Sequence, residues 1–317
     1  MIDKLESFIE KSFLKELIEN PNITDISYNG KSFFYVHNAE GRKKASIKAS
    51  SVEVIDFIRQ IANHSEKQFS YSVPFLDVSV GKYRINAVHP SLVRVFNDKS
   101  CSFSIRIGSE KSKIVDDFNF VDKECRKYLE KVIENEDSVV IAGPTGSGKT
   151  ELQKYLLLNL RANSRVIVID NVEELEYVRF NDDLDITSWQ VSQTNQNASI
   201  QELVRNALRS NPDWLVIAES RGKEMNEILN SGMTGHPIIT TLHARALEDI
   251  PKRICRMVEM SDVTQKHENI LEDIYDHLKV YVFLNRKFNK SGGVERYVES
   301  IGEIQKDHSM KIIYRRK

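Results

Sequence analysis

The first 110 residues combine short apolar runs with two helical patterns, which predicts a small α+β domain. Leu5, Ile9 and Phe13 recur at the spacing of one helix face, so we expect a helix over about the first 20 residues, ended by Pro21. This amphipathic helix would either pack on its own domain, the preferred interpretation, or lie on a membrane surface. A further helix is predicted at residues 52–62, among strand-type runs at 32–36, 76–80, 83–88 and 101–107.

From residue 122 onward the apolar runs are continuous rather than alternating. A predicted helix at 123–133 comes first, and the runs then occupy residues 139–142, 166–169, 214–218, 238–242 and 280–284. Continuous runs are typical of strands buried on both faces, so they predict an α/β domain with a parallel sheet covered by helices. The polar stretch 108–113 separates the two patterns. We therefore predict an α+β domain at 1–110, a linker at 111–120 and an α/β domain at 121–317.

The composition narrows the class of protein. The 45 Lys and Arg residues almost balance the 46 Asp and Glu residues, which argues against a nucleic-acid binder that relies on a basic excess. No run approaches the ~18 apolar residues of a membrane-spanning helix. The N-terminus lacks the small-residue cleavage site of a secretory signal, so we expect a cytoplasmic protein.

The cysteines and histidines show none of the common metal-binding spacings. Cys101, Cys125 and Cys255 are far apart, which argues against a disulfide framework or a four-cysteine zinc site. The eight histidines contain no HExxH pattern. We interpret the cysteines as ordinary thiols without a ligand.

The first apolar run of the second domain leads into a glycine-rich loop and then into a helical stretch at 151–160. The loop has the form G-x4-G-K-T of a Walker A motif, made by Gly143, Pro144, Thr145, Gly146, Ser147, Gly148, Lys149 and Thr150. Such a loop turns backbone N–H groups inward as an anion nest, and the helix adds its positive N-terminal end. Lys149 would reach the β- and γ-phosphates, and the Thr150 hydroxyl would bind Mg²⁺. The sequence thus predicts ATP and Mg²⁺ as ligands.

Phosphoryl transfer also needs carboxylates at the ends of neighbouring strands. The run 214–218 ends in Glu219, which is the Walker B form with Glu in place of Asp. A second apolar run ends in Asp170 and is followed by Glu173 and Glu174. These two glutamates would either activate water or only begin an exposed helix, where acids favour the helix dipole. Spacing alone leaves both interpretations open.

Two histidines flank the fourth apolar run. His236 precedes the run and His243 follows it, within the segment TGHPIITTLHA at 234–244. A histidine beside a core strand is usually a structural hydrogen-bonding group. His243, however, follows the strand where a γ-phosphate sensor would be expected.

In combination, these motifs resemble the type II/type IV secretion and pilus ATPases, also called traffic ATPases. That family has Walker A, Asp box, Walker B and His box motifs in the order found here. The His box pattern TGHxxxTTxHA is matched at every fixed position, and residues 208–222 are similar to LRxxPDxxxxGExRG. Segments similar to further family motifs lie at 23–30, 74–77, 84–88 and 104–107. The resemblance covers roughly residues 22–302.

Some features depart from the family or separate its branches. The Asp box usually reads Glu-Asp-Thr/Pro-x-Glu, whereas residues 170–174 read DNVEE, and Ala218 replaces a glycine of Walker B. Three scattered cysteines cannot build the four-cysteine zinc insert common in type II assembly ATPases. The compact chain with SIRI at 104–107 looks most like the conjugation/type IV secretion branch.

The resemblance implies a RecA-like P-loop ATPase domain after the α+β domain, and it implies roles for particular residues. Glu174 would polarise the attacking water and Glu219 would hold Mg²⁺ through water, with the two roles open to exchange. His243 would sense the γ-phosphate or brace Glu219. Arg84 and Arg106 would reach the nucleotide from the N-terminal domain, with a hinge within 108–120. Weaker candidates for contacts with phosphate or with a neighbouring subunit are Arg209, Arg221 and His236.

The leading functional hypothesis is an ATP-hydrolysing motor that powers type IV secretion or conjugative transfer. The resemblance implies a homohexameric ring at the inner face of the cell membrane, in contact with membrane components of the secretion or conjugation machinery. Sequence-specific binding of nucleic acid is not expected. Three alternatives stay open: a pilus or competence-pseudopilus assembly ATPase, a nucleotide-gated scaffold with weak hydrolysis, and a RecA-like DNA motor.

Overall fold

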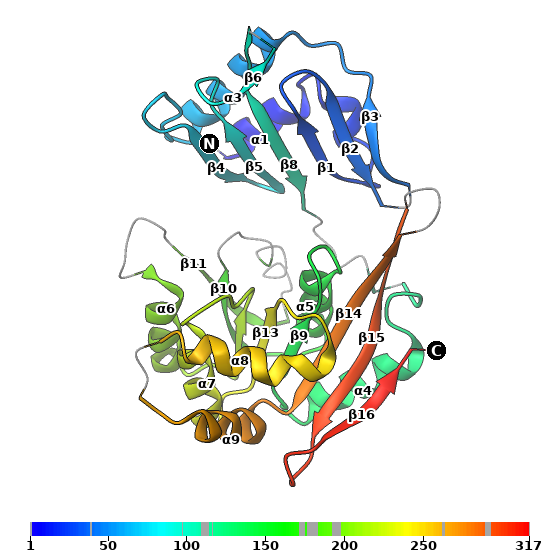
Figure 1. Cartoon of the computed structure of the whole chain (residues 1–317), viewed down its shortest axis with the longest axis vertical. Coiled ribbons are helices and arrows are strands. Elements are labelled where there is room, and N and C mark those ends of the chain that lie inside the picture. The colour runs from blue at the N-terminus through cyan, green and yellow to red at the C-terminus, as the bar shows by residue number, and fades with distance from the viewer. Residues whose placement is uncertain are drawn as a thin grey trace. The chain divides into compact units, whose positions relative to one another are not determined.

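The structure, a computed structural model, divides into two compact units (Figure 1). It describes residues 2–316 apart from 39, 97, 109–113, 116, 171–174, 176–182, 192–197, 262–263 and 289–292. Unit 1 comprises Met1–Glu110 and Phe288–Glu295, and unit 2 comprises Lys111–Lys287 and Arg296–Lys317. None of the described helices is long and apolar enough to cross a membrane.

Unit 1 contains an antiparallel sheet with the strand order β3-β2-β1-β8-β5-β4. Side chains alternate along β5, so that Tyr83, Ile85 and Ala87 face a buried core. The main strands are β1 (Ile23–Tyr28), β2 (Phe33–His37), β3 (Gly41–Ala45), β4 (Phe75–Val80), β5 (Tyr83–Val88) and β8 (Ser102–Ile107), and a separate short hairpin joins β6 (Arg94–Val95) and β7 (Asp98–Lys99).

The helices of unit 1 supply the other side of that core. Helix α3 (Ser51–His64) begins with a capping box, in which Ser50 and Glu53 satisfy each other's backbone N–H groups. The single N-terminal helix expected from the sequence is instead two, α1 (Ile2–Glu10) and α2 (Lys15–Ile18). The hydroxyl of Ser12 accepts the Leu14 N–H at 3.2 Å and so favours a turn between them. Leu5, Ile9 and Leu14 are buried in the core of unit 1, as packing on its own domain requires.

Unit 2 is built on a sheet of eight described strands in the order β11-β10-β12-β13-β9-β14-β15-β16. The pairs from β11 to β14 are all parallel, and β15 pairs with β16 in antiparallel fashion. The strands are β9 (Val139–Ala142), β10 (Arg165–Asp170), β11 (Asp185–Gln190), β12 (Trp214–Ile217), β13 (Ile238–Leu242), β14 (Val280–Phe288), β15 (Val294–Ile304) and β16 (Met310–Arg315). The predicted α/β class with a parallel-rich sheet and a smaller α+β domain is confirmed.

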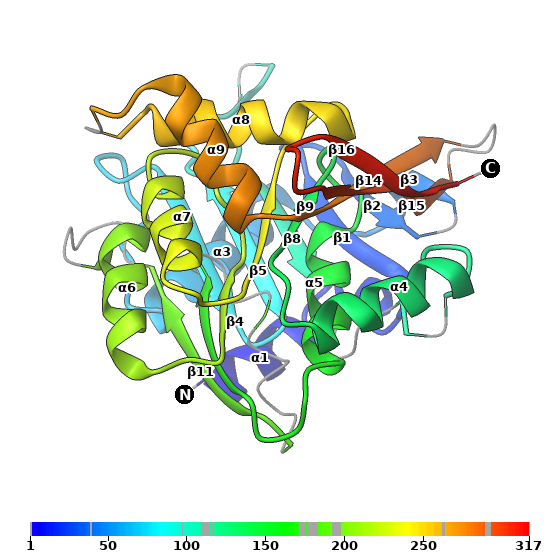
Figure 2. The same cartoon turned by 90° about the horizontal axis from the view of Figure 1, so that it is seen from below.

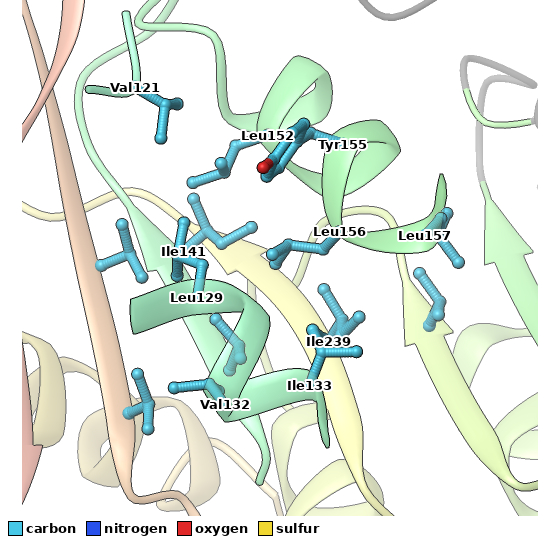
Figure 3. Close-up of a cluster of buried hydrophobic side chains, with 14 of the residues drawn as sticks. Val121, Leu129, Val132, Ile133, Ile141, Leu152, Tyr155, Leu156, Leu157 and Ile239 are labelled. Carbon is cyan, nitrogen blue, oxygen red and sulfur yellow. The ribbon is translucent and has the colours of Figure 1, made fainter. Parts of the chain in front are cut away.

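Helices cover both faces of this sheet, so its central strands are buried on each side (Figure 2). Val139 and Ile141 of β9 face one core with α4 and α5, whereas Val140 and Ala142 face the other core with helices α6 to α9. Figure 3 shows the first core, where Leu129 and Leu152 pack around Ile141. The helices are α4 (Lys123–Glu134), α5 (Lys149–Leu158), α6 (Ile200–Ala207), α7 (Met225–Met233), α8 (Ile250–Val258) and α9 (His267–His277), with short 3-10 turns at Leu208–Ser210 and Leu247–Asp249.

The described part of the predicted linker packs on unit 2. Ile114 and Phe120 are buried in the core that also contains Leu129. The Arg126 guanidinium of α4 donates hydrogen bonds to four carbonyls of this segment, those of Ile114, Val115, Asp117 and Val121, at 2.6–3.2 Å. These bonds fasten the described residues Ile114, Val115, Asp117 and Val121 to α4. The hinge expected within 108–120 stays a prediction. Residues 109–113 lie outside the described residues.

Candidate active site

The Walker A loop joins β9 to α5 and approaches other backbone very closely. A Cβ atom at Gly143 would lie 2.4 Å from the carbonyl oxygen of Leu284 in β14. Gly148 has a φ of +95°, and a Cβ there would lie 2.6 Å from the ring of Phe120. Only glycine fits at either position without displacing a neighbour. This explains why glycine occupies both fixed glycine positions of the Walker A pattern.

Lys149 is the first residue of α5 and is buried beneath this loop. Its ammonium group donates to the carbonyls of Gly143 at 3.2 Å and Pro144 at 3.3 Å, and it lies 3.3 Å from Nδ1 of His243. Three fixed partners hold a positive charge at the point where the loop meets the N-terminal end of a helix. This arrangement can attract an anion that contacts both the loop N–H groups and the lysine.

Glu219 follows β12 by two residues and faces the same place. Its Oε1 lies 2.9 Å from Nε2 of His243, and its Oε2 accepts a hydrogen bond from Arg221 at 2.7 Å. Burial tends to raise the pKa of Glu219, but the hydrogen bond and charge of Arg221, with the charges of His243 and Lys149, outweigh burial and leave the pKa below its ordinary value. Glu219 is therefore ionised at neutral pH.

His243 connects the lysine to the glutamate. Nε2 of His243 lies 2.9 Å from Oε1 of Glu219, an ion-pair distance, but the two atoms are not in hydrogen-bond geometry and Oε1 is buried without a hydrogen-bond partner among the described residues. Nδ1 either accepts from Lys149 or, when it carries a hydrogen, donates to the Gly143 carbonyl at 3.2 Å. Lys149, His243 and Glu219, which come from three sequence motifs, form one connected cluster.

Hydrogen bonds between neighbouring elements hold the strand ends that carry this cluster. Thr241 donates to the carbonyl of Ala218 at 2.7 Å, and the hydroxyls of Ser220 and Thr240 lie 2.8 Å apart. Gln153 of α5 donates to the carbonyl of Ile217 at 2.8 Å. The Walker A helix, β12 and β13 are thus linked directly below the site. The threonine pair of the His box therefore has a positioning role that spacing alone does not reveal.

The loop has three further neighbours that the sequence motifs do not indicate. Arg296 of β15 donates to the Gly146 carbonyl at 2.8 Å. A Cβ at Gly146 would lie 3.0 Å from a guanidinium nitrogen of Arg286 in β14. The ring of Phe120 packs against Gly148. Arg286 follows the predicted run at 280–284, and Arg296 lies in a stretch for which no strand was predicted, so the motifs give no sign that the two arginines reach the loop.

Two predicted residues lie at the N-terminal ends of β12 and β13, opposite the strand ends that carry Glu219 and His243. His236 precedes β13, where its Nδ1 lies 3.0 Å from the Thr234 hydroxyl, and Arg209 precedes β12. The length of β13, roughly 13 Å for its five residues, separates His236 from His243. His236 and Arg209 therefore lie at the opposite ends of these strands from Glu219 and His243. Their contacts with phosphate or with a neighbouring subunit stay predictions.

Two other predicted residues belong to unit 1. Arg84 of β5 and Arg106 of β8 are direct cross-strand partners, and Arg106 Nε lies 3.4 Å from a carboxylate oxygen of Asp25. Their neighbours Ile85 and Ile105 face the core, so both arginines lie on the outer face of the sheet. Their contact with a nucleotide stays a prediction.

The Asp box is described only in part. Asp170 ends β10 and is buried, and its carboxylate accepts the Leu175 N–H at 3.0 Å. Glu173 and Glu174 lie outside the described residues. The role expected for Glu174 stays a prediction.

The residues of the loop fit a nucleotide phosphate with a hard divalent cation. The Ser147 hydroxyl is fully buried within the loop and has no hydrogen-bond partner among the described residues. Thr150 is the second residue of α5, next to Lys149, and Glu219 supplies an ionised carboxylate whose pKa is lowered in part by the charge of Lys149. Hydroxyl and carboxylate oxygens are the protein ligands that Mg²⁺ prefers.

Comparison with known proteins identifies the family. The profile described as "Type II/IV secretion system protein" matches residues 92–280, more than half of the chain. An uncharacterised protein of Bacillus anthracis is 30% identical over 286 residues, which are 86% of this chain and 62% of that protein. The type IV secretion system protein VirB11 of Brucella suis is 32% identical over 134 residues, which are 41% of this chain and 37% of VirB11. The chain thus spans less than two thirds of the length of these relatives.

The fold comparison agrees with this assignment. The ATPase DotB of Legionella pneumophila has a similar structure, with a TM-score of 0.72, 20% sequence identity and coverage of 93% of this chain and 80% of DotB. With 20% identity, this likeness concerns the fold: two units, of which one carries the P-loop. The chain belongs to the type II/IV secretion system family of traffic ATPases and resembles the type IV branch of that family.

Proposed function

We propose that this chain is the ATP-hydrolysing motor subunit of a type IV secretion or conjugative transfer machine. The single observation that carries the proposal is the connected cluster of Lys149, His243 and Glu219. A P-loop lysine and a strand-end carboxylate are groups that P-loop ATPases use at the β- and γ-phosphates, and His243 lies between the two. Similarity to VirB11 over 134 residues supports the secretion role.

Each group has a separate task in this proposal. The loop N–H groups and Lys149 bind the β- and γ-phosphates, and the buried Ser147 hydroxyl donates to a phosphate oxygen. Thr150 and Glu219 hold Mg²⁺, the latter through water. The cation, when bound, neutralises charge that develops on the β- and γ-phosphate oxygens.

Water activation is assigned to Glu174 in this proposal, and Glu219 holds the cation, with the two roles open to exchange. The lowered pKa of Glu219 suits a carboxylate that stays ionised beside a cation. In this proposal His243, whose Nε2 lies 2.9 Å from the Glu219 carboxylate, positions that carboxylate by its close approach.

Unit 1 completes the site in this proposal. Arg84 and Arg106 share the outer face of their sheet, where two guanidiniums can close on the β- and γ-phosphates together. Closure would couple ATP binding to the angle between the units, and repetition around a homohexamer would turn closure into motion of the ring. We place this ring in the cytoplasm, at the inner face of the membrane that holds the rest of the machine.

ATP turnover of Lys149→Ala tests the enzymatic part of the proposal. The variant should lose measurable turnover with its fold intact, because the phosphates lose their main cationic partner in the loop. Lys154→Ala is the matched control, since Lys154 is also a buried lysine of α5 but pairs with Glu151 at 3.3 Å. Its turnover should stay near that of the wild-type chain. Turnover of Lys149→Ala within a few-fold of wild type would contradict the assignment.

The same assay separates the alternatives. A nucleotide-gated scaffold would bind ATP with negligible wild-type turnover, and a DNA motor would be stimulated by added DNA. We expect clear turnover that DNA does not change. Co-purification from the native host then distinguishes a secretion motor from a pilus assembly ATPase, by whether secretion components or pilins are recovered.

The ring is tested by light scattering with ATP and Mg²⁺. The full chain should form a particle of the mass of six subunits. A head-to-tail interface that is repeated from one subunit to the next closes into a ring. A chain that stays strictly monomeric at micromolar concentration with both ligands would contradict the ring.

A further inference from the structure

A second cluster of polar side chains lies in unit 2, between α8 and the start of α9. It consists of Cys255, Glu259 and His267, whose Sγ, carboxylate oxygen and Nδ1 all lie within 4.8 Å of one another. The Sγ to Nδ1 distance is 3.4 Å and the Nδ1 to Oε1 distance is 2.6 Å. The cluster contains no residue of the proposed ATP site.

The helices place these three groups in one spot. Cys255 and Glu259 are one turn apart at the end of α8, so their side chains point the same way. His267 is the first residue of α9. Ile254 of α8 and Ile270 of α9 belong to one buried core, which fixes the two helices against each other. The cluster is therefore positioned by rigid elements.

When the other contacts of this cluster are made, the contact between the Cys255 sulfur and the His267 ring nitrogen has no hydrogen of its own. Nδ1 of His267 faces both the Cys255 sulfur and the Glu259 carboxylate, yet a neutral ring carries at most one hydrogen at that nitrogen. If the hydrogen points to Glu259, the nitrogen cannot accept from the thiol, whose remaining partner is the His267 carbonyl at 3.9 Å. A cation satisfies all three groups at once, since sulfur, ring nitrogen and carboxylate oxygen each offer a lone pair.

We propose that Cys255, Glu259 and His267 bind one zinc-class divalent ion. Thiolate, imidazole and carboxylate together favour Zn²⁺ among the common divalent ions, whereas Mg²⁺ and Ca²⁺ prefer oxygen alone. Three protein ligands leave a fourth position of the tetrahedron to water or to another ligand. The ion would tie the end of α8 to the start of α9 across residues 260–266.

Two of the three distances between ligand atoms suit such an ion after a small adjustment, and the third pair, sulfur and carboxylate, lies within 4.8 Å. Zinc–ligand bonds of about 2.0–2.3 Å in a tetrahedron hold neighbouring ligand atoms roughly 3.3–3.6 Å apart. The sulfur and nitrogen already have this separation. The nitrogen and the carboxylate must move apart by less than about 1 Å. The side chains of His267 and Glu259 are 49% and 41% exposed and have room to move.

Binding of Zn²⁺ and Co²⁺ by the purified full chain tests the proposal. After treatment with a chelator, the chain should take up one Zn²⁺ in competition with a chromophoric chelator. Titration with Co²⁺ should give a thiolate-to-cobalt charge-transfer band, which arises only when a cysteine binds the metal. Cys255→Ser should remove the band. Glu259→Gln and His267→Gln should each weaken Zn²⁺ binding by at least about tenfold.

Matched variants keep the outcome interpretable. Cys125→Ser removes another buried cysteine, and His308→Gln removes a histidine paired with Asp276 at 3.0 Å. Both should bind Zn²⁺ as the wild-type chain does. Lys149→Ala should do so too, which separates this proposal from the ATPase one. His267 and Glu259 are exposed, so their variants test the site even if Cys255→Ser fails to fold. Absence of stoichiometric Zn²⁺ binding, or binding unchanged in Glu259→Gln and His267→Gln, would overturn the proposal.

Discussion

Among the described residues of unit 2, two histidines lie close to glutamates at similar distances but in different surroundings. His243 lies 2.9 Å from Glu219, and His267 lies 2.6 Å from Glu259. The first pair has Lys149 as its third member, and the second has Cys255. An ammonium group attracts anions, whereas a thiol can become a ligand for a soft cation. The third partner, more than the pair, determines which ligand each site suits.

The two pairs also differ in what supports them. Glu219 follows a buried parallel strand and is only 22% exposed, and Arg221 with Lys149 helps to hold its pKa below the ordinary value. Glu259 follows a helix and is 41% exposed. Because the pKa of Glu219 is lowered, its ionic contacts are present above the unfolded pKa and are lost only as the pH falls through the folded value. The Glu219 pair should thus persist throughout the neutral range.

Replacement of each glutamate in turn gives the largest expected contrast. Glu219→Gln should keep nucleotide binding and reduce ATP turnover by ~10²-fold or more, because the amide lacks the charge that positions the cation and its water. Glu259→Gln is the matched control and should leave turnover unchanged. The measurement is steady-state ATP hydrolysis, with nucleotide affinity determined separately.

Equal turnover in Glu219→Gln and the wild-type chain would move the essential carboxylate elsewhere, with Glu174 as the first candidate. A loss in Glu259→Gln as large as that in Glu219→Gln would mean that the two pairs do not act separately.

Replacement of the histidines should have a smaller effect. His243→Ala should lower turnover by roughly tenfold and affinity much less, since His243 positions Glu219 rather than binding substrate tightly. His267→Gln should leave turnover unchanged. The readout is the separate change in kcat and KM. A parallel loss of turnover and affinity in His243→Ala would indicate a purely structural histidine.

The central part of the fold could be predicted from the sequence, because short continuous apolar runs between helical stretches are typical of buried parallel strands. The runs at 139–142 and 238–242 coincide with β9 and β13. One edge strand of each sheet, β3 and β11, was missed, whereas the edge strand β4 was predicted from the run at 76–80. β3 has the sequence GRKKA, and only its glycine is buried, so no apolar pattern marks it. β11 is half-buried at the other sheet's edge and has no apolar run either. Pairing with a neighbouring strand forms these edges, and sequence periodicity does not show pairing.

The residues of the candidate ATP site that belong to sequence motifs were predicted, and those outside the motifs were not. Lys149, Glu219 and His243 were each identified from the strand or loop that precedes them, and the structure brings them together. Arg286 and Arg296 were missed because the strand pairing of β14 and β15 carries them to the loop. The cluster around Cys255 was missed for a related reason. Its members belong to two helices, and no motif spacing joins Cys255 to His267.

A double variant tests most directly whether the cluster of Lys149, His243 and Glu219 acts as one catalytic unit. If His243 acts by positioning Glu219, its loss should cost nothing once that carboxylate is gone. The measurement is ATP turnover of Glu219→Gln/His243→Ala beside the two single variants. The account predicts that the double variant is as slow as Glu219→Gln, within about twofold. Losses that multiply in the double variant would show that the two residues act independently and would contradict the account.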